Sequence, residues 1–300
     1  MKFGFFNDWN LGVVRGDAIV DVSDALRGVH AHSPMELARA VLEGLDGMRS
    51  RLETLAQERE GQPLSAVTLL PPVPHPDKII CMAVNYLEGE NPPMPDIDAF
   101  LKASDCVIGH GGTVLMDPAC EARIFHAEPE VAVVIGKRGR HVDEADAMEH
   151  VLGYTGFFDV SGRIQVRGSQ SYFQSKSWAT FGPMGPFIVT KDEIADPHDI
   201  DVRVWNGDYN FPGYNTREMA HKIPECIAFA SRIMELNVGD IISTGTNHQN
   251  LGAIQDGDEV GMEIAGVGTL SFTVSDPAKR EWPRGRDEAM ASRMRAGGNP

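Results

Sequence analysis

The stretch Phe125-His126-Ala127-Glu128-Pro129-Glu130-Val131-Ala132-Val133-Val134-Ile135-Gly136 places two carboxylates two residues apart, directly before an unbroken apolar run. The apolar run predicts a buried strand. Residues i and i+2 of a strand point to the same face, so Glu128 and Glu130 should converge at its mouth. Convergent carboxylates repel each other unless a cation lies between them, and carboxylate oxygens suit Mg²⁺, Mn²⁺ or Ca²⁺. An exposed strand with alternating charges would give the same pattern.

Two further features favour the metal interpretation. Pro129 separates the two glutamates, and proline within a strand indicates a bulge or an edge position, where an ion can be reached. Asp159 ends a second apolar strand, over residues 151–158, and an acid at that position must face solvent, a partner or an ion. Asp159 thus strengthens the case for a cation near Glu128 and Glu130, and a strand with alternating charges remains the alternative.

The composition bounds the class of protein. The chain has 300 residues, of which 42% are hydrophobic and 23% charged, as in a globular protein. A net charge of -16 without a basic stripe argues against nucleic acid and anionic membranes as partners. The four cysteines form no Cys-x-x-Cys motif, and the N-terminal stretch lacks the long apolar core of a signal peptide. We expect a cytoplasmic protein.

The order of elements predicts an α+β fold with mainly antiparallel or mixed sheet. Ser33-Pro34-Met35-Glu36 has capping-box spacing and predicts a helix over residues 33–55, although Gly44 and Gly47 could interrupt it. Four prolines between residues 71 and 76 predict a linker. The turns at Asn206-Gly207 and at residues 266–268, each between short apolar stretches, predict two antiparallel hairpins. We expect a small N-terminal α+β domain over residues 1–72, a larger domain over 73–277, and a polar C-terminal tail over 278–300 that is exposed or disordered.

Lys78-Ile79-Ile80-Cys81 is followed by Asn85-Tyr86, and Glu128-x-Glu130 is followed by Asp159 and Lys176. Taken in order over about residues 75–275, these stretches resemble the fumarylacetoacetate hydrolase family. The first resembles a strand of the family, and Glu128-x-Glu130 resembles its Glu-x-Glu metal motif. Asp159 matches the third carboxylate, and Lys176 matches the active-site lysine. The match continues through the stretches Phe181-Gly182-Pro183-Met184-Gly185-Pro186, Asn215-Thr216, Gly239-Asp240, Ser243-Thr244-Gly245-Thr246 and Gly266-x-Gly268-Thr269-Leu270.

The resemblance implies a β-roll catalytic domain, usually in a homodimer, and a chemistry. Mg²⁺ or Mn²⁺ held by three carboxylates would bind a 2-oxo acid or diketone, polarise its carbonyl and stabilise the enolate left when a C–C bond breaks. Lys176 beside this site could hold a carboxylate or the developing oxyanion. Thr246 could hydrogen-bond the substrate or serve only as a turn residue. Tyr86 could line the pocket or simply pack.

The sequence departs from the family where protons are moved. Hydrolytic and decarboxylating members typically carry a histidine and a glutamate on a lid helix shortly after Asn-Tyr. Here that stretch is Leu87-Glu88-Gly89-Glu90-Asn91-Pro92, which has no histidine, and the prolines speak against a helix. Acid–base catalysis needs a positioned titratable group. The candidates are His248 in the loop after Thr246, Glu88 or Glu90 in the lid, and His126. His110 lies in a Gly-rich turn and is expected to be structural.

The resemblance favours a metal-dependent hydrolase that cleaves a C–C bond in an acylpyruvate-like 2-oxo acid or 1,3-dicarbonyl, such as an intermediate of aromatic catabolism. In this scheme Glu128, Glu130 and Asp159 hold the ion, Lys176 and Thr246 hold the substrate, and the proton is moved by His248 or a lid residue. An isomerase, decarboxylase or hydratase acting on a similar acid is the alternative. Because the lid histidine is missing, a non-catalytic relative that binds a metal and a dicarboxylate is a further one.

Overall fold

A computed structural model describes residues 1–89, 92–166, 169–296 and 298. The N-terminal part contains β1 (Lys2–Phe6), β2 (Asn10–Arg15), β3 (Ala18–Asp21), α1 (Pro34–Glu58), β4 (Gln62–Pro63) and β5 (Leu69–Leu70). The first half of the remaining chain contains β6 (Ile79–Met82), β7 (Ala99–Lys102), β8 (Val107–Ile108), β9 (Thr113–Leu115), β10 (Phe125–Ile135), β11 (Val151–Gly162), β12 (Gln165–Val166) and β13 (Ser169–Gln170). The second half contains α2 (Tyr172–Lys176), β14 (Gly182–Thr190), β15 (Asp201–Asn206), β16 (Tyr209–Asn215), α3 (Ile223–Ile233), β17 (Ile241–Ser243), β18 (Glu259–Ile264), β19 (Gly268–Ser275) and α4 (Glu288–Arg295).

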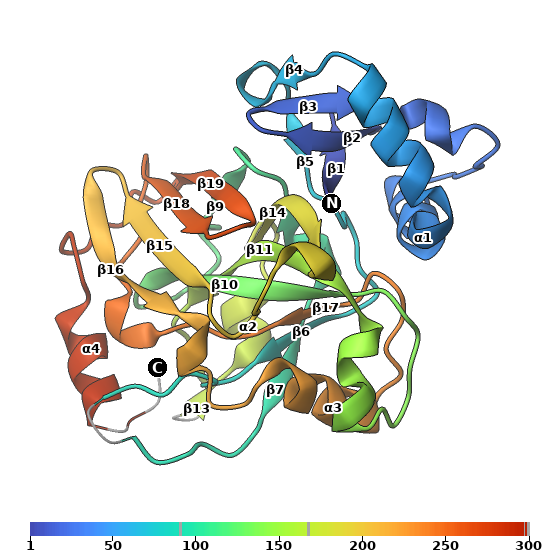
Figure 1. Cartoon of the computed structure of the whole chain (residues 1–300). Coiled ribbons are helices and arrows are strands. Elements are labelled where there is room, and N and C mark those ends of the chain that lie inside the picture. The colour runs from blue at the N-terminus through green and yellow to red at the C-terminus, as the bar shows by residue number, and fades with distance from the viewer. Residues whose placement is uncertain (90–91, 167–168, 297, 299–300) are drawn as a thin grey trace.

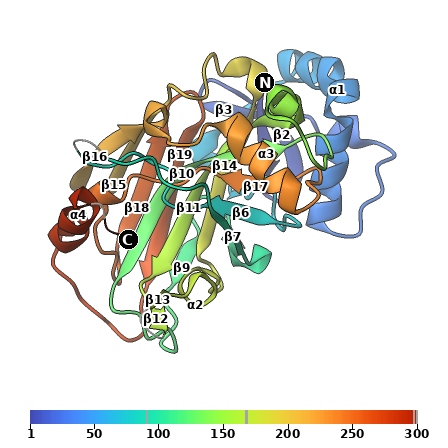
Figure 2. The same cartoon turned by 90° about the horizontal axis from the view of Figure 1, so that it is seen from below.

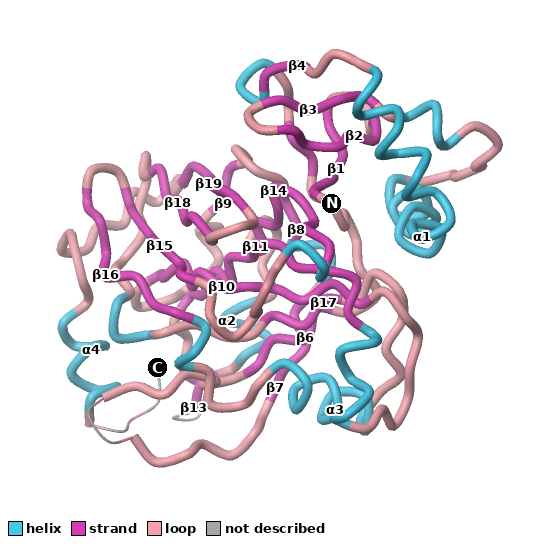
Figure 3. The backbone as a smooth tube through the Cα atoms, viewed as in Figure 1, coloured by secondary structure: helices cyan, strands magenta, loops and turns pink. Residues whose placement is uncertain are grey.

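Two sheets form the body of the molecule (Figure 1). The larger sheet has the order β4-β3-β2-β1-β14-β11-β10-β17-β6-β7, and β5 and β8 join it beside β1 and β14. The smaller sheet has the order β16-β15-β18-β19-β9. Most pairs are antiparallel, whereas β17–β6, β14–β8 and β19–β9 are parallel. Strands dominate the tube drawing, as the predicted α+β class with mixed sheet requires (Figure 3).

The strand β10 lies in the middle of the larger sheet, between β11 and β17 (Figure 2). All of its residues are buried, because both faces of the sheet are covered. On one face, Ala132 and Val134 join a core with the N-terminal strands and α1. On the other face, Val131 and Val133 join a core with the smaller sheet, where the Phe158 and Phe272 rings meet edge to face at 5.0 Å.

At Pro129, β10 pairs with a neighbouring strand on one side only. It pairs with Phe158 of β11, whereas β17 pairs only with residues 132–134 of β10. The missing N–H of proline therefore leaves no ladder bond to β17 unmade. This position agrees with the edge environment that the sequence predicts for Pro129, and it opens the end of the strand that carries the two glutamates.

The sequence predicts the first helix and the hairpins correctly. In α1 the Ser33 hydroxyl accepts a hydrogen bond from the Glu36 N–H, as the capping box requires, and neither Gly44 nor Gly47 interrupts the helix. The strands β15–β16 and β18–β19 form the two expected antiparallel hairpins. The described residues between 87 and 98 form neither helix nor strand, in agreement with the doubt about a lid helix.

Two expectations about domain organisation meet different outcomes. The strand β1 pairs with β14, so the larger sheet continues across the expected boundary at residue 72, and this boundary stays a prediction. The expectation of an exposed or disordered tail from residue 278 is wrong for α4, in which Met290, Ala291 and Met294 are buried. Among the described residues, no helix has the length and apolar character to cross a membrane.

Candidate functional site

Three buried carboxylates converge at the end of β10 and β11. Glu128 and Asp159 are direct partners across the two strands, and Glu130 lies two residues further along the same face. One oxygen from each carboxylate can be chosen so that all three lie within 4.8 Å of one another. Each side chain belongs to a residue that is at most 2% exposed. The structure thus brings together the three residues that the sequence predicts as metal ligands.

Three cations surround two of these carboxylates. The Lys176 ammonium donates to Glu128 Oε2 at 2.7 Å and to Asp159 Oδ2 at 2.6 Å. The Lys102 ammonium donates to Asp159 Oδ1 at 2.6 Å, and Arg163 Nη2 donates to Glu128 Oε1 at 2.6 Å. Charge-assisted bonds of this kind compensate the cost of burying charge. Burial acts to raise the pKa of Glu128, but the charges of Lys176 and Arg163 outweigh it and hold that pKa well below the ordinary value.

Glu130 is bound differently. Its Oε2 accepts hydrogen bonds from the Ser243 hydroxyl at 2.5 Å and from the Gly245 N–H at 2.9 Å. Within the described residues, every ion pair of the triad involves Glu128 or Asp159. Burial, followed by the charges of Asp159 and Glu128, raises the pKa of Glu130 to about 8. A buried carboxylate without a cation beside two others is a place where a divalent cation would relieve repulsion.

The donor set also fits such an ion. Carboxylate oxygens are the ligands that Mg²⁺, Mn²⁺ and Ca²⁺ prefer. Lys176 lies between Glu128 and Asp159, so its ammonium already supplies part of the positive charge that these carboxylates need. Burial acts to lower the pKa of Lys176, but the charges of Asp159 and Glu128 outweigh it and raise that pKa. The lysine therefore stays charged beside the candidate metal centre.

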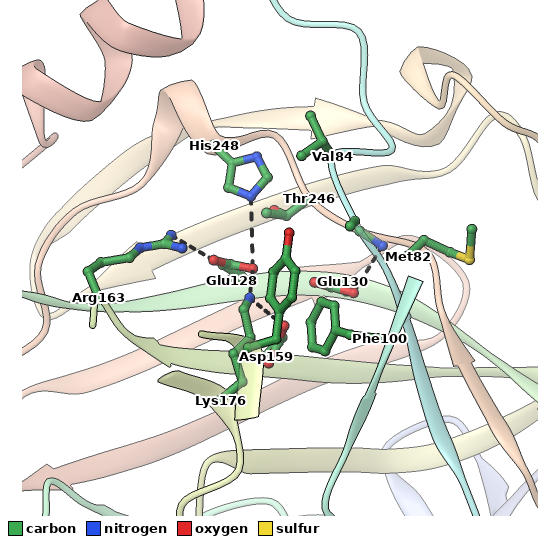
Figure 4. A pocket seen from close by; sticks show the side chains of 13 residues that line it. Met82, Val84, Phe100, Glu128, Glu130, Asp159, Arg163, Lys176, Thr246 and His248 are labelled. Carbon is green, nitrogen blue, oxygen red and sulfur yellow. Dashed lines mark hydrogen bonds and ion pairs between the residues drawn. The ribbon is translucent and has the colours of Figure 1, made fainter. Parts of the chain in front are cut away.

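Glu88 and His248 form a buried pair beside the triad. Glu88 Oε1 accepts from both the backbone N–H and the Nδ1 of His248, each at 2.9 Å, and its Oε2 accepts from the Gln249 N–H at 2.8 Å. Because Nδ1 donates to Glu88, the other ring nitrogen of neutral His248 is free to accept a proton. This Nε2 lies 3.9 Å from Glu128 Oε2 (Figure 4). A histidine oriented by a carboxylate is a suitable acid–base group.

A small pocket connects the triad to His248 (Figure 4). Two of its polar atoms, Thr246 Oγ1 and Arg163 Nη1, are buried and have no hydrogen-bond partner among the described residues. Unpaired buried donors are costly, so they are suited to a polar ligand. Thr246 thus lines the pocket with an unpaired hydroxyl, and its contact with a substrate stays a prediction. The lining residues are Met82, Ala83, Val84, Phe100, Glu128, Glu130, Asp159, Arg163, Tyr172, Lys176, Gly245, Thr246 and His248.

Other candidates lie elsewhere. Tyr86 does not line this pocket; its ring is buried edge-to-face against Tyr214 at 4.9 Å, and its hydroxyl has no hydrogen-bond partner among the described residues. His126 is fully buried and bonds to Arg163, outside the pocket lining. His110 accepts from the Ser271 N–H in its turn, which agrees with a structural role. Glu90 lies outside the described residues.

The structure adds Lys102 and Arg163 to the predicted set. Arg163 could have been found from the sequence, since residues 159, 161 and 163 alternate along one strand and its extension, as Glu128 and Glu130 do. Lys102 gives no comparable signal, because it is a single lysine at the end of the short strand β7 and meets Asp159 only through the folding of the sheet.

Comparison with known proteins agrees with this site. Residues 78–275 match the model of the fumarylacetoacetate (FAA) hydrolase C-terminal domain. The mitochondrial oxaloacetate tautomerase FAHD2A of Bos taurus is 37% identical over 231 residues, which cover 72% of each chain. The human FAHD2A is 34% identical over 252 residues, or 79% of each chain. Since both relatives are named as mitochondrial, the cytoplasmic location stays a prediction.

Solved structures show the same architecture. The maleylpyruvate hydrolase from Sphingobium sp. SYK-6, in complex with manganese(II) and pyruvate, superposes with a TM-score of 0.80 at 33% identity and covers 92% of this chain and 99% of its own. The 5-carboxymethyl-2-hydroxymuconate delta-isomerase from Mycobacterium smegmatis has a TM-score of 0.72 at 28% identity and covers 93% of this chain and 100% of its own. The matched domain and the similarity to these relatives show that the chain belongs to the fumarylacetoacetate hydrolase family.

Proposed function

We propose that this protein is a divalent-metal-dependent hydrolase that cleaves a C–C bond in a small acylpyruvate-like 2-oxo acid. The observation that carries the proposal is the Glu88–His248 pair, because it supplies a positioned base in the same pocket as three carboxylates suited to a metal. The similarity to a maleylpyruvate hydrolase solved with manganese(II) and pyruvate supports this substrate class.

The metal would be held by Glu128, Glu130 and Asp159, and Mg²⁺ or Mn²⁺ are the candidates. When bound, such an ion would polarise the 2-oxo carbonyl of the substrate and stabilise negative charge on its oxygen. Arg163 and Thr246 would bind the polar groups of the acid through Nη1 and Oγ1, which are buried without a hydrogen-bond partner among the described residues. Lys176 adds a fixed positive charge at the same end of the pocket.

His248 would move the protons. Its Nε2 takes a proton from water, and the hydroxide adds to the distal carbonyl carbon of the substrate. The bond between that carbon and the neighbouring methylene then breaks, and its electron pair remains on the methylene carbon. The proton held by His248 returns to this carbon, so the products are a carboxylic acid and pyruvate. By accepting from Nδ1, Glu88 would keep the imidazole in the tautomer that these proton transfers need.

A second candidate is a tautomerase that interconverts the keto and enol forms of a 2-oxo diacid such as oxaloacetate. The similarity to curated oxaloacetate tautomerases favours it. The same His248 could remove the proton from the carbon beside the 2-oxo group and return it, without a water molecule being consumed. The two candidates therefore share the base and differ in the fate of the C–C bond.

A substrate panel separates the candidates. Acylpyruvates, oxaloacetate and ring-opened catechol products are incubated with the protein and Mg²⁺ or Mn²⁺, and enol absorbance, pyruvate and carbon dioxide are measured. Pyruvate released from an acylpyruvate identifies the hydrolase, whereas accelerated loss of enol without pyruvate identifies the tautomerase. Carbon dioxide from oxaloacetate would indicate a decarboxylase. Tight binding without turnover across the panel would sink both proposals and favour a non-catalytic binder. Glu128→Ala serves as the control and should abolish metal binding and turnover.

A further inference from the structure

Residues 276–295, here called the C-terminal segment, are connected by polar contacts to the start of β10 and the residues before it. The Arg280 guanidinium donates to the carboxylate of Asp276 and to the Met116 and Cys120 carbonyls, and it lies 4.7 Å from the centre of the Phe125 ring. Trp282 Nε1 donates to the Arg123 carbonyl at 2.8 Å. These contacts hold the segment in front of α4 against the strand that carries Glu128.

Asp287 continues this connection into the buried interior. It is the N-cap of α4, where its Oδ1 accepts from the Met290 N–H at 3.0 Å. Its Oδ2 lies 3.2 Å from His126 Nε2, although this N–H is not aligned well enough for a regular hydrogen bond. His126 is fully buried, and its Nδ1 accepts from Arg163 Nε at 3.1 Å. Because Nδ1 accepts, the proton of neutral His126 lies on Nε2, facing the carboxylate.

Arg163 links this series to the candidate metal ligand. Its Nη2 donates to Glu128 Oε1 at 2.6 Å, and the Ser161 hydroxyl donates to the same oxygen at 3.1 Å. The other oxygen of Glu128, Oε2, is thereby left for Lys176 and the interior of the triad. A guanidinium is a rigid planar fork, so fixing its Nε on His126 also fixes the direction in which Nη2 meets Glu128.

We propose that Asp287 and His126 are positioning residues that hold Arg163 against Glu128, so that the C-terminal segment takes part in preorganising the metal centre. This proposal rests only on the metal site of the proposed function and not on the reaction. Groups that hydrogen-bond a ligating carboxylate orient it, and their loss typically weakens metal affinity by about 10- to 100-fold. His126 contacts Arg163 rather than Glu128, and Asp287 contacts His126. We therefore expect substitutions of these two residues to weaken metal affinity less.

The test measures Mn²⁺ binding by the full-length protein after chelation and dialysis, with free Mn²⁺ followed by electron paramagnetic resonance. Asp287→Asn removes the charge but keeps the size and the capping ability of the side chain. His126→Leu removes both contacts of the imidazole. We expect a weakening of Mn²⁺ affinity of about tenfold for His126→Leu and about threefold for Asp287→Asn. In the double variant, Asp287→Asn should add nothing to the effect of His126→Leu.

His126→Asn provides a second route. The asparagine oxygen can replace Nδ1 as the acceptor for Arg163 but cannot reach Asp287, so this variant should match Asp287→Asn and recover part of the affinity lost in His126→Leu. If His126→Leu does not fold, the cycle of His126→Asn with Asp287→Asn replaces it. Glu288→Gln is the matched control, because it removes the same charge from the exposed side of the same helix turn. It should bind Mn²⁺ like the wild-type protein.

The outcomes are distinct. Unchanged Mn²⁺ affinity in folded Asp287→Asn and His126→Leu, or losses that simply add in the double variant, would overturn the proposal. A lower melting temperature of the metal-free variants without a change in affinity would assign these residues a purely structural role. If the wild-type protein itself bound no Mn²⁺, the metal site would fail and this inference with it. If the wild-type protein bound Mn²⁺ but turned over no substrate, only the proposed reaction would fail.

Discussion

Glu88 and His248, separated by 160 positions in the sequence, form a buried pair in which one carboxylate oxygen accepts both the backbone N–H and the Nδ1 of the histidine. Within the described residues, His248 lines the pocket that contains the three carboxylates, and Glu88 lies behind it as its hydrogen-bond partner. Here the glutamate comes from the loop after Tyr86 and the histidine from the loop after β17. The chain thus offers an acid–base group without the expected lid motif.

His248→Asn should lower kcat by roughly 10²- to 10⁴-fold, because it removes the base, while KM should change little. Glu88→Gln keeps an acceptor for His248 but loses the negative charge, so its fall in kcat should be smaller. Steady-state kinetics on whichever acylpyruvate or oxaloacetate the substrate panel selects would measure both effects.

The control for this pair is His75→Asn, which changes an exposed histidine outside the pocket lining and should leave kcat unaltered. A wild-type kcat in His248→Asn would remove the histidine from the mechanism. An increase in KM alone would instead make it a substrate-binding residue.

Glu130 should make metal binding depend on pH. Its pKa is raised to about 8, first by burial, so below pH 8 the metal-free protein carries a proton there that a cation must displace. The apparent Mn²⁺ affinity should therefore rise from pH 6 to pH 8, by at most about tenfold per pH unit, and level off above. Calorimetry in buffers of different ionisation enthalpy should detect about one proton released per ion at pH 7.

The same shift has a defined sign for stability. The folded pKa of Glu130 lies above the ordinary value of 4.5, so the protonated form stabilises the metal-free fold most fully below pH 4.5. This contribution is lost as the pH rises through about 8.

Glu130→Gln should bind Mn²⁺ weakly with little pH dependence. A flat affinity profile between pH 6 and pH 8 in the wild-type protein would contradict the assignment.

The sequence predicts well that the three carboxylates lie in strands that could carry a metal site, because the relevant rules are local. Glu128 and Glu130 follow the two-residue period of a strand, and Asp159 stands at the end of an apolar run, where a buried acid needs a partner. The structure adds the register in which Glu128 lies opposite Asp159. Register depends on how two strands meet, and neither strand alone determines it.

The remaining site residues depend on long-range contacts. Glu88 and His248 could each be named as candidates, but their pairing arises from two loops that meet only in the folded chain. Lys102 carries no local signal for its contact with Asp159. Tyr86 was a plausible pocket residue by position, yet its ring packs against Tyr214 of another strand.

The C-terminal segment shows a different limit of sequence reasoning. A low apolar content predicts an exposed tail, because the rule counts hydrophobic side chains. Here the segment is held by Arg280 and Asp276, whose hydrogen bonds tie it to the body, and by the single large side chain of Trp282. The sequence does not reveal which groups such polar side chains will bind. It therefore gives no sign that they hold the segment from which α4 begins.

Gly245 should be required for the position of Glu130. Its φ of 86° is left-handed, its N–H donates to Glu130, and an added Cβ would lie 3.2 Å from the Asn85 Cβ. Gly245→Ala should lower both the free energy of unfolding and the Mn²⁺ affinity. Gly257→Ala is the matched control, since Gly257 has a φ of 80° with open space around it. It should cost about 1–2 kcal/mol of stability from the backbone alone and leave Mn²⁺ binding intact. Equal Mn²⁺ affinities in the two variants would refute the role of Gly245.

Lys102→Met should destabilise the metal-free protein strongly. Lys102 is 3% exposed, and its ammonium is the partner of Asp159 Oδ1, so its removal leaves that oxygen buried without its cation. Breaking a buried ion pair from one side costs about 3–5 kcal/mol, which urea denaturation would measure. Lys137→Met, which breaks the exposed pair with Glu149, should leave stability close to that of the wild-type protein. If both variants lost stability equally, Lys102 would not be the charge that compensates Asp159. A loss confined to Lys102→Met would make this lysine part of the buried ion-pair network that holds Asp159 in the folded protein.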